Sequence, residues 1–110
     1  MINYKLAKQL KDAGFPQNTR NYFYLIDGIV VDEVYTEMEA KLDTNMANWE
    51  KSFACPTLSE LIDACGDEFD HLGRGPMGRW NALAADDTGL DISAKTSEEA
   101  VAKLYLKLNK

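Results

Sequence analysis

An Asp-Gly dipeptide at residues 27 and 28, between two runs of strand-forming residues, restricts the fold of this chain more than any other feature. Apolar and aromatic side chains fill residues 22–26 before it, and Ile-Val-Val follows at residues 29–31. Asp-Gly accepts the two positive φ angles of a type I′ turn, whose twist matches that of the strands it joins. The pattern predicts a β-hairpin in which Ile26 lies opposite Ile29. Both faces are apolar near the turn, so we expect at least part of the hairpin to be covered on both sides.

Three segments combine the apolar spacing of helices with residues that typically start or end one. Residues 3–13 carry one apolar face, and Gly14 suits the left-handed position that ends such a helix. Residues 57–65 begin with Thr-Leu-Ser-Glu, which forms a capping box. A similar Thr-Ser-Glu-Glu sequence precedes an apolar stripe in residues 97–109. We therefore predict three helices in these segments.

A second pair of strands is predicted near the middle of the chain. Residues 69–72 and 79–83 have strand-forming composition, and the glycine-rich residues between them make a longer connection than a tight turn. Residues 84–95 are small and polar, which indicates a loop. The Asp-Asp pair at positions 86 and 87 in this loop is interpreted as a solvated surface.

Residues 34–54 fit two structures. Their apolar residues alternate with polar ones, as in a half-buried strand. Val34, Met38 and Leu42 also recur every four residues, which favours a helix whose apolar stripe would extend to Phe53. The sequence leaves both open and favours the helix.

These elements predict one α+β domain over residues 1–110, in which two β-hairpins form an antiparallel sheet packed against three or four helices. A chain of 110 residues is long enough for one small core and too short for two domains. An isolated hairpin is marginally stable in water, so we expect the helices to cover the strands.

The charge of the chain excludes some classes of partner. Twelve Lys and Arg against 18 Asp and Glu give a net charge of −6, which argues against direct nucleic-acid binding. The sequence has no apolar stretch long enough for a signal peptide or a membrane span, so we expect a cytoplasmic protein with no membrane contact. The sequence is also compatible with a homo-oligomer.

The cysteines and the histidine do not suggest a metal or cofactor. Cys55 and Cys65 stand at opposite ends of a predicted helix, too far apart for a disulfide. We interpret them as reduced, buried thiols. Together with the single histidine they fall short of a zinc set, and the acidic residues near His71 match no known cation loop.

Three groups of residues follow one another in the second half of the chain. They are Pro-Thr-Leu-Ser-Glu-Leu-Ile-Asp-Ala-Cys-Gly at residues 56–66, then Phe69, Leu72 and Trp80-Asn81-Ala82, and last residues 96–109. In this order they resemble small uncharacterised proteins encoded by bacteriophages and prophages, and the match spans about half of the chain. It implies origin and architecture but no activity, cofactor or catalytic residue. Residues 34–54 look like an insertion, where a specialised function would lie.

Binding to a host protein is the function that we predict. Asp32, Glu33, Glu37, Glu39 and Asp43 make the densest negative stretch in the first half of the chain, and such a surface can occupy a basic groove on an enzyme. We therefore expect a non-enzymatic phage accessory protein, located in the bacterial cytoplasm, that inhibits a defence or metabolic protein of the host. The candidate interface residues are Glu37, Glu39, Asp43 and Trp49.

A loop with two arginines suggests an alternative function. Arg74 and Arg79 flank glycines that allow close approach of a ligand, and Trp80 can stack on a ring. These residues, with His71 nearby, make a candidate site for a small anion or nucleotide that the protein would sequester. The loop matches no Walker or dinucleotide motif.

A hydrolase centred on His71 is the third hypothesis. Asp70 precedes His71, and a carboxylate can orient an imidazole for general base catalysis. Neighbouring residues of a strand point to opposite faces, however, so we expect a direct contact between these two side chains to be unfavourable.

Overall fold

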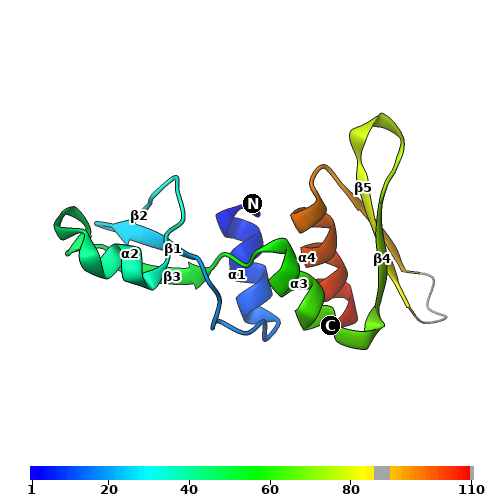
Figure 1. Cartoon of the computed structure of the whole chain (residues 1–110), viewed down its shortest axis with the longest axis horizontal. Helices are drawn as coiled ribbons and strands as arrows, with labels where there is room; N and C mark the ends of the chain where they lie inside the picture. Colours follow the sequence, from blue (N-terminus) through cyan, green and yellow to red (C-terminus); the bar gives the residue numbers. More distant parts are fainter. Residues whose placement is uncertain (86–89, 110) are drawn as a thin grey trace.

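The computed structural model describes residues 1–85 and 90–109, and places a three-stranded sheet at each end of an elongated molecule (Figure 1). The molecule extends over 49 × 29 × 20 Å, and its radius of gyration is 15.1 Å. A compact chain of this length would have a radius of gyration of about 13 Å. The described helices and strands are α1 (Tyr4–Asp12), β1 (Tyr22–Ile26), β2 (Ile29–Val30), α2 (Glu37–Leu42), η1 (Thr44–Met46), β3 (Glu50–Ala54), α3 (Leu58–Cys65), η2 (Gly66–Glu68), β4 (Phe69–Arg74), η3 (Pro76–Gly78), β5 (Trp80–Ala84), β6 (Asp91–Ala94) and α4 (Ser97–Leu108).

The first sheet has the strand order β2-β1-β3 and is antiparallel. Ile26 pairs with Ile29, as the Asp-Gly turn predicts. Asp27 has a φ of 51° and Gly28 a φ of 83°, the two positive angles that such a turn requires. The predicted hairpin is confirmed.

The alternation of side chains along β1 places its aromatic residues in two cores. Phe23 joins the main core and meets the Tyr4 ring of α1 edge-on, with the centroids 5.3 Å apart. Tyr22 and Tyr24 point to the opposite face and form a small second core with Ala54. Residues 22–24 of this strand are therefore covered on both faces, whereas the expected cover is absent near the turn, where Ile26 and Ile29 are exposed.

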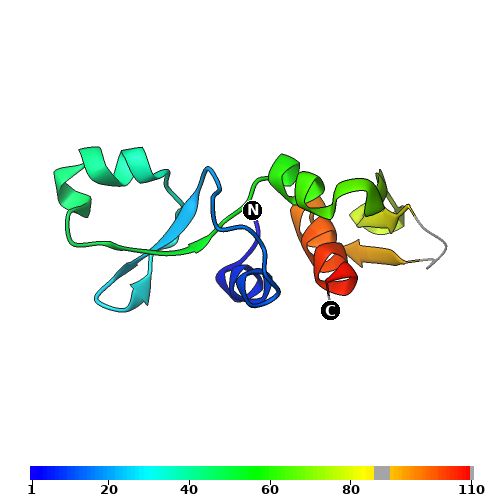
Figure 2. The same cartoon turned by 90° about the horizontal axis from the view of Figure 1, so that it is seen from below.

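Helices α1, α3 and α4 confirm the three predicted helices and lie between the two sheets (Figures 1 and 2). The Asn3 side chain accepts a hydrogen bond from the Leu6 amide at the start of α1, and Gly14, with a φ of 90°, follows its end. The predicted capping box at Thr57 is present in α3. Thr96 caps α4, where the Glu99 carboxylate lies 2.9 Å from Lys103. Local sequence signals thus determine these helix boundaries.

The second sheet, β4-β5-β6, contains the other predicted pair of strands. The mixed α+β class with antiparallel strands against helices is as predicted, but the two hairpins lie in separate sheets because the three long helices stand between them. The prediction of a loop over residues 84–95 is wrong in part, since Asp91–Ala94 is strand β6 and pairs with β5. Asp86 and Asp87 lie outside the described residues.

Residues 34–54 are neither one helix nor one strand. They form the short helix α2, the turn η1 and strand β3, which pairs with the open edge of β1. The expected apolar stripe is wrong: Met38 and Leu42 are exposed, while Phe53 lies in a strand. Backbone pairing with β1 outweighs helix periodicity in residues 50–54.

No helix within residues 1–85 and 90–109 has the length and apolar character needed to cross a bilayer.

Candidate functional site

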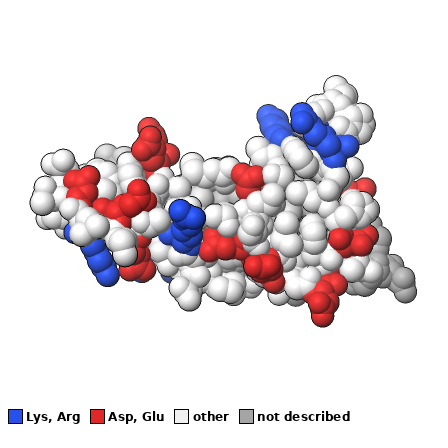
Figure 3. All heavy atoms as spheres, viewed as in Figure 1, with Lys and Arg blue, Asp and Glu red and all other residues white. Residues whose placement is uncertain are grey.

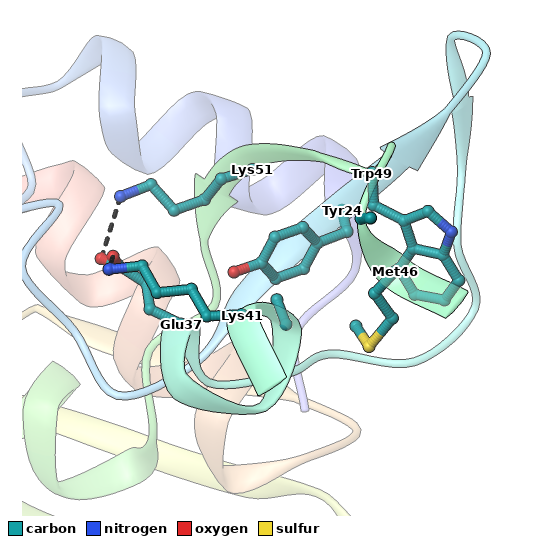
Figure 4. Close-up of a pocket in the computed structure, with 8 residues that line it drawn as sticks. Tyr24, Glu37, Lys41, Met46, Trp49 and Lys51 are labelled. Atoms are coloured by element: carbon teal, nitrogen blue, oxygen red, sulfur yellow. Dashed lines mark hydrogen bonds and ion pairs between the residues drawn. The ribbon is translucent and has the colours of Figure 1, made fainter. Parts of the chain in front are cut away.

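The 34–54 segment forms a pocket against the first sheet, and both charged and apolar side chains line it (Figure 4). Its volume is about 450 Å³. Helix α2 and η1 form one wall, and strands β1 and β3 form the other. The lining residues are Tyr24, Glu37, Ala40, Lys41, Met46, Ala47, Trp49 and Lys51.

Helix α2 is stabilised mainly at its first turn. The Thr36 hydroxyl accepts a hydrogen bond from the Glu39 amide, and the Glu39 carboxylate accepts one from the Thr36 amide at 2.8 Å. These bonds lower the pKa of the Glu39 carboxyl. A helix of six residues is unstable alone, so this capping box and packing on the sheet hold it in place.

One end of the pocket is charged. The Glu37 carboxylate lies 2.9 Å from the Lys51 ammonium and 3.9 Å from that of Lys41. The hydrogen bond from Lys51 lowers the pKa of Glu37, and the same bond raises the pKa of Lys51. Lys51 also lies over the Tyr22 ring, 4.7 Å from its centroid. Glu37 and Lys51 are thus held by partners, whereas Lys41 is only loosely paired.

The other end of the pocket is apolar. Met46 is buried, and the half-buried Trp49 ring packs edge-on against Tyr35 with the centroids 5.7 Å apart. Ala40 faces inward from α2 and packs on the second core. Figure 4 shows the Tyr24 ring between the two ends, with its hydroxyl directed toward the charged side chains. The pocket therefore offers an apolar surface next to a group of hydrogen-bond donors.

Helix α2 has its two large apolar residues on the side away from the pocket. Ala40 faces the sheet, while Met38 and Leu42 are 70% and 78% exposed. Residues four apart lie on one helix face, so these two form a pair of adjacent apolar side chains in solvent. This arrangement is the reverse of an ordinary surface helix.

Two of the predicted interface residues line the pocket, and the other two make local hydrogen bonds. Glu37 and Trp49 line the pocket, and Glu39 caps α2. The Asp43 carboxylate accepts a hydrogen bond from the Asn45 amide at 2.9 Å. The predicted residues therefore lie in and beside the pocket, and the exposed Met38 and Leu42 are not among them because their spacing resembles that of a core stripe.

The predicted anion site lies on the β4–β5 hairpin, where Figure 3 shows a group of basic side chains on a mainly acidic face. Arg74 pairs across the strands with Trp80, and its guanidinium carbon lies 5.6 Å from the ring centroid. The Arg79 Nε donates to the Ser93 hydroxyl at 2.9 Å. The structure thus brings Arg74 and Trp80 together and ties Arg79 to strand β6.

His71 does contact Asp70, contrary to the expectation from strand alternation. The His71 Nδ1 lies 3.0 Å from the Asp70 Oδ2. The register of β4 and β5 shifts between Phe69 and His71, and such a bulge breaks the regular alternation of side chains. Both side chains are more than half exposed, at 59% and 56%.

The two cysteines are the reduced, buried thiols that the sequence predicts. Cys55 and Cys65 are free and buried, and burial raises the pKa of both thiols to about 11. In the part of the chain that the structure describes, no group of three metal-ligating side chains comes together.

Comparison with protein-family models, with curated proteins and with solved structures found no match to this chain. The resemblance to phage-encoded proteins therefore remains a prediction.

Proposed function

We propose that this chain is a non-enzymatic binding protein whose outward face of α2 contacts a partner protein. The observation that carries the proposal is the reversed orientation of this helix, which directs Ala40 inward and the larger Met38 and Leu42 into solvent. Burying a large apolar side chain contributes about 1.5–3 kcal/mol. Two such side chains four residues apart are the anchors that a helix inserts into a groove.

Charge favours a partner with a basic rim. Glu39 and Asp43 flank the apolar pair on α2 and in the turn after it, and the chain as a whole carries a charge of −6. A groove lined by apolar residues and bordered by Lys or Arg would complement this face and speed association. A bacterial host protein of defence or metabolism, inhibited by a phage-encoded chain, is the partner that we propose.

Two charged substitutions test the surface. The double variant Met38→Glu and Leu42→Glu should fold normally, because both side chains are exposed, but should weaken partner binding at least tenfold, as removing anchor residues typically does. Met77→Glu is the matched control, since Met77 is 98% exposed on η3 at the far end of the molecule. Bacterial lysate is passed over the three immobilised proteins, and each retained protein is purified and its Kd measured by calorimetry.

Retention by the original chain and by Met77→Glu, but not by the double variant, supports the proposal. A partner that the double variant binds normally and Met77→Glu does not would place the contact on the β4–β5 hairpin. The absence of any protein that distinguishes the double variant would show that the α2 face is not an interface.

Sequestration of a small anion by the β4–β5 hairpin is the second candidate. The stacked Arg74 and Trp80 favour it, because a planar ligand can extend such a stack. The hydrogen bonds from Arg79 to Ser93 weigh against it, since they use the second guanidinium. Loss of nucleotide binding in Arg74→Ala, measured by calorimetry with AMP, would identify this function.

A further inference from the structure

The Tyr24 hydroxyl has no hydrogen-bond partner among the described residues, although the tyrosine is only 3% exposed. Every fully enclosed side-chain nitrogen or oxygen in the described part of the chain has a partner, so this hydroxyl is open to the pocket that it lines. Figure 4 shows it directed at the charged end, where it can donate a hydrogen bond to a bound group.

We propose that the pocket between α2, η1 and strands β1 and β3 binds a small organic carboxylate that carries an apolar group. The carboxylate accepts hydrogen bonds from the Tyr24 hydroxyl and the Lys41 ammonium, and the apolar group lies against Met46 and Trp49. This site uses the inward side of α2, whereas the proposed partner surface uses the outward side.

The charges at the pocket select an anion. Lys41 and Lys51 line it together with a single carboxylate, Glu37, which Lys51 already neutralises at 2.9 Å. Lys41, 3.9 Å from Glu37 and 77% exposed, is free to turn toward a ligand. Burial and the nearby Glu37 charge raise the pKa of Tyr24, so the hydroxyl keeps its proton and donates. A protonated amine would bind poorly, because Lys51 already pairs with Glu37 and the ammonium groups of Lys41 and Lys51 would repel it.

The size and lining of the pocket limit the apolar group. A volume of about 450 Å³ lies within the range of small-molecule sites. The indole of Trp49 and the thioether of Met46 provide the surfaces on which an aromatic or branched aliphatic group packs. A monocyclic aryl carboxylate such as 3-phenylpropionate combines these properties and serves as the probe.

Binding is measured by NMR on the ¹⁵N-labelled full chain. The sequence has two tryptophans, so the indole N–H of Trp49 reports on the pocket and that of Trp80, at the other end of the molecule, serves as an internal reference. We expect 3-phenylpropionate to shift the Trp49 signal saturably and to leave the Trp80 signal in place. The amide and the amine of the same skeleton, 3-phenylpropanamide and 3-phenylpropylamine, should bind at least tenfold more weakly. A hydrogen bond to a carboxylate is stronger than one to a neutral group, and neither analogue offers a carboxylate.

Two tyrosine variants test the hydroxyl itself. Tyr24→Phe should weaken 3-phenylpropionate binding about tenfold, the size expected for one hydrogen bond to a charged group. It should leave the thermal midpoint unchanged or slightly raised, because the hydroxyl it removes has no partner in the free chain. Tyr35→Phe is the matched control, since the Tyr35 hydroxyl bonds to Glu33 and does not line the pocket. Lys41→Gln should also weaken binding.

Three results would overturn the inference. The first is no shift of the Trp49 indole with the carboxylate at millimolar concentration, and the second is equal or tighter binding of the amine. The third is unchanged affinity in Tyr24→Phe. The uncharged double variant Met38→Ala and Leu42→Ala removes the same apolar anchors without adding carboxylates beside Lys41, and it should bind 3-phenylpropionate normally. Failure of the ligand site and failure of the partner surface are therefore distinguishable.

Discussion

At the scale of single residues, burial decides the reactivity of the two cysteines. Burial raises the pKa of Cys55 and Cys65 to about 11, and only the thiolate reacts with disulfide reagents. We expect native protein at pH 8 to react with Ellman's reagent far more slowly than free cysteine, and both thiols to react at once in denaturant. Rapid labelling of a cysteine in the native protein would contradict the buried placement.

Burial also separates two leucines that look equivalent in the sequence. Leu61 in α3 is 0% exposed, and replacing it with alanine should lower the free energy of unfolding by about 2–5 kcal/mol. Leu42 in α2 is 78% exposed, so Leu42→Ala should change the free energy of unfolding by about 0.5 kcal/mol or less. Urea denaturation of both variants measures the difference. Equal effects would mean that α2 packs with its apolar face inward.

At the scale of elements, helix α2 depends on ionised carboxylates. Hydrogen bonds lower the pKa of Glu39, and the Lys51 bond lowers that of Glu37, from the ordinary value of 4.5. A group with a lowered pKa in the folded chain stabilises it above the ordinary pKa, and that contribution is lost as the pH falls toward the lowered value.

We therefore expect acid to release α2 before the rest of the fold. Below about pH 4.5, amide signals of residues 36–43 should lose their dispersion while those of α4 persist, as NMR spectra at successive pH values would show. Glu39→Gln keeps an acceptor for the Thr36 amide, and in this variant the dispersion of the α2 amide signals should depend less on pH. Simultaneous loss of α2 and α4 signals would show that the capping box does not set the stability of α2.

At the scale of the whole molecule, the two cores differ in size. The main core gathers buried residues from α1, α3, α4 and the second sheet, while the second core has only Tyr22, Tyr24 and Ala54 fully buried. Helix α2 contributes no buried residue, and α4 contributes five. Segments with few buried contacts open at low free energy.

Hydrogen exchange should reveal this difference. We expect amides of α2 and η1 to exchange orders of magnitude faster than those of α4, because local opening exposes α2 without disturbing the main core. Mass spectrometry of peptides after deuterium labelling would measure both regions in one sample. Equal protection of the two helices would indicate a single cooperative unit. Addition of 3-phenylpropionate should slow exchange in α2 if the pocket binds it.

The candidate site was only partly predictable. Glu37 and Trp49 belong to a segment that the sequence marks as acidic and unusual, and both line the pocket. Tyr24 precedes them by more than ten residues, in a different element, and looks like an ordinary strand tyrosine. The pocket exists because β3 pairs with β1 and brings α2 over Tyr24, a contact for which no local pattern gives a signal.

The sequence by itself determined the local structure. The Asp-Gly turn, the Asn3 cap and the Thr57 capping box act within a few residues, and the hydrogen bonds that they predict are present. Only the tertiary structure decided that the two hairpins lie in different sheets, that β3 and β6 complete them, and that α2 turns Ala40 inward. Caps and turns depend on neighbours along the chain. The pairing of a strand edge and the orientation of a short helix depend instead on which distant surface is available to cover them.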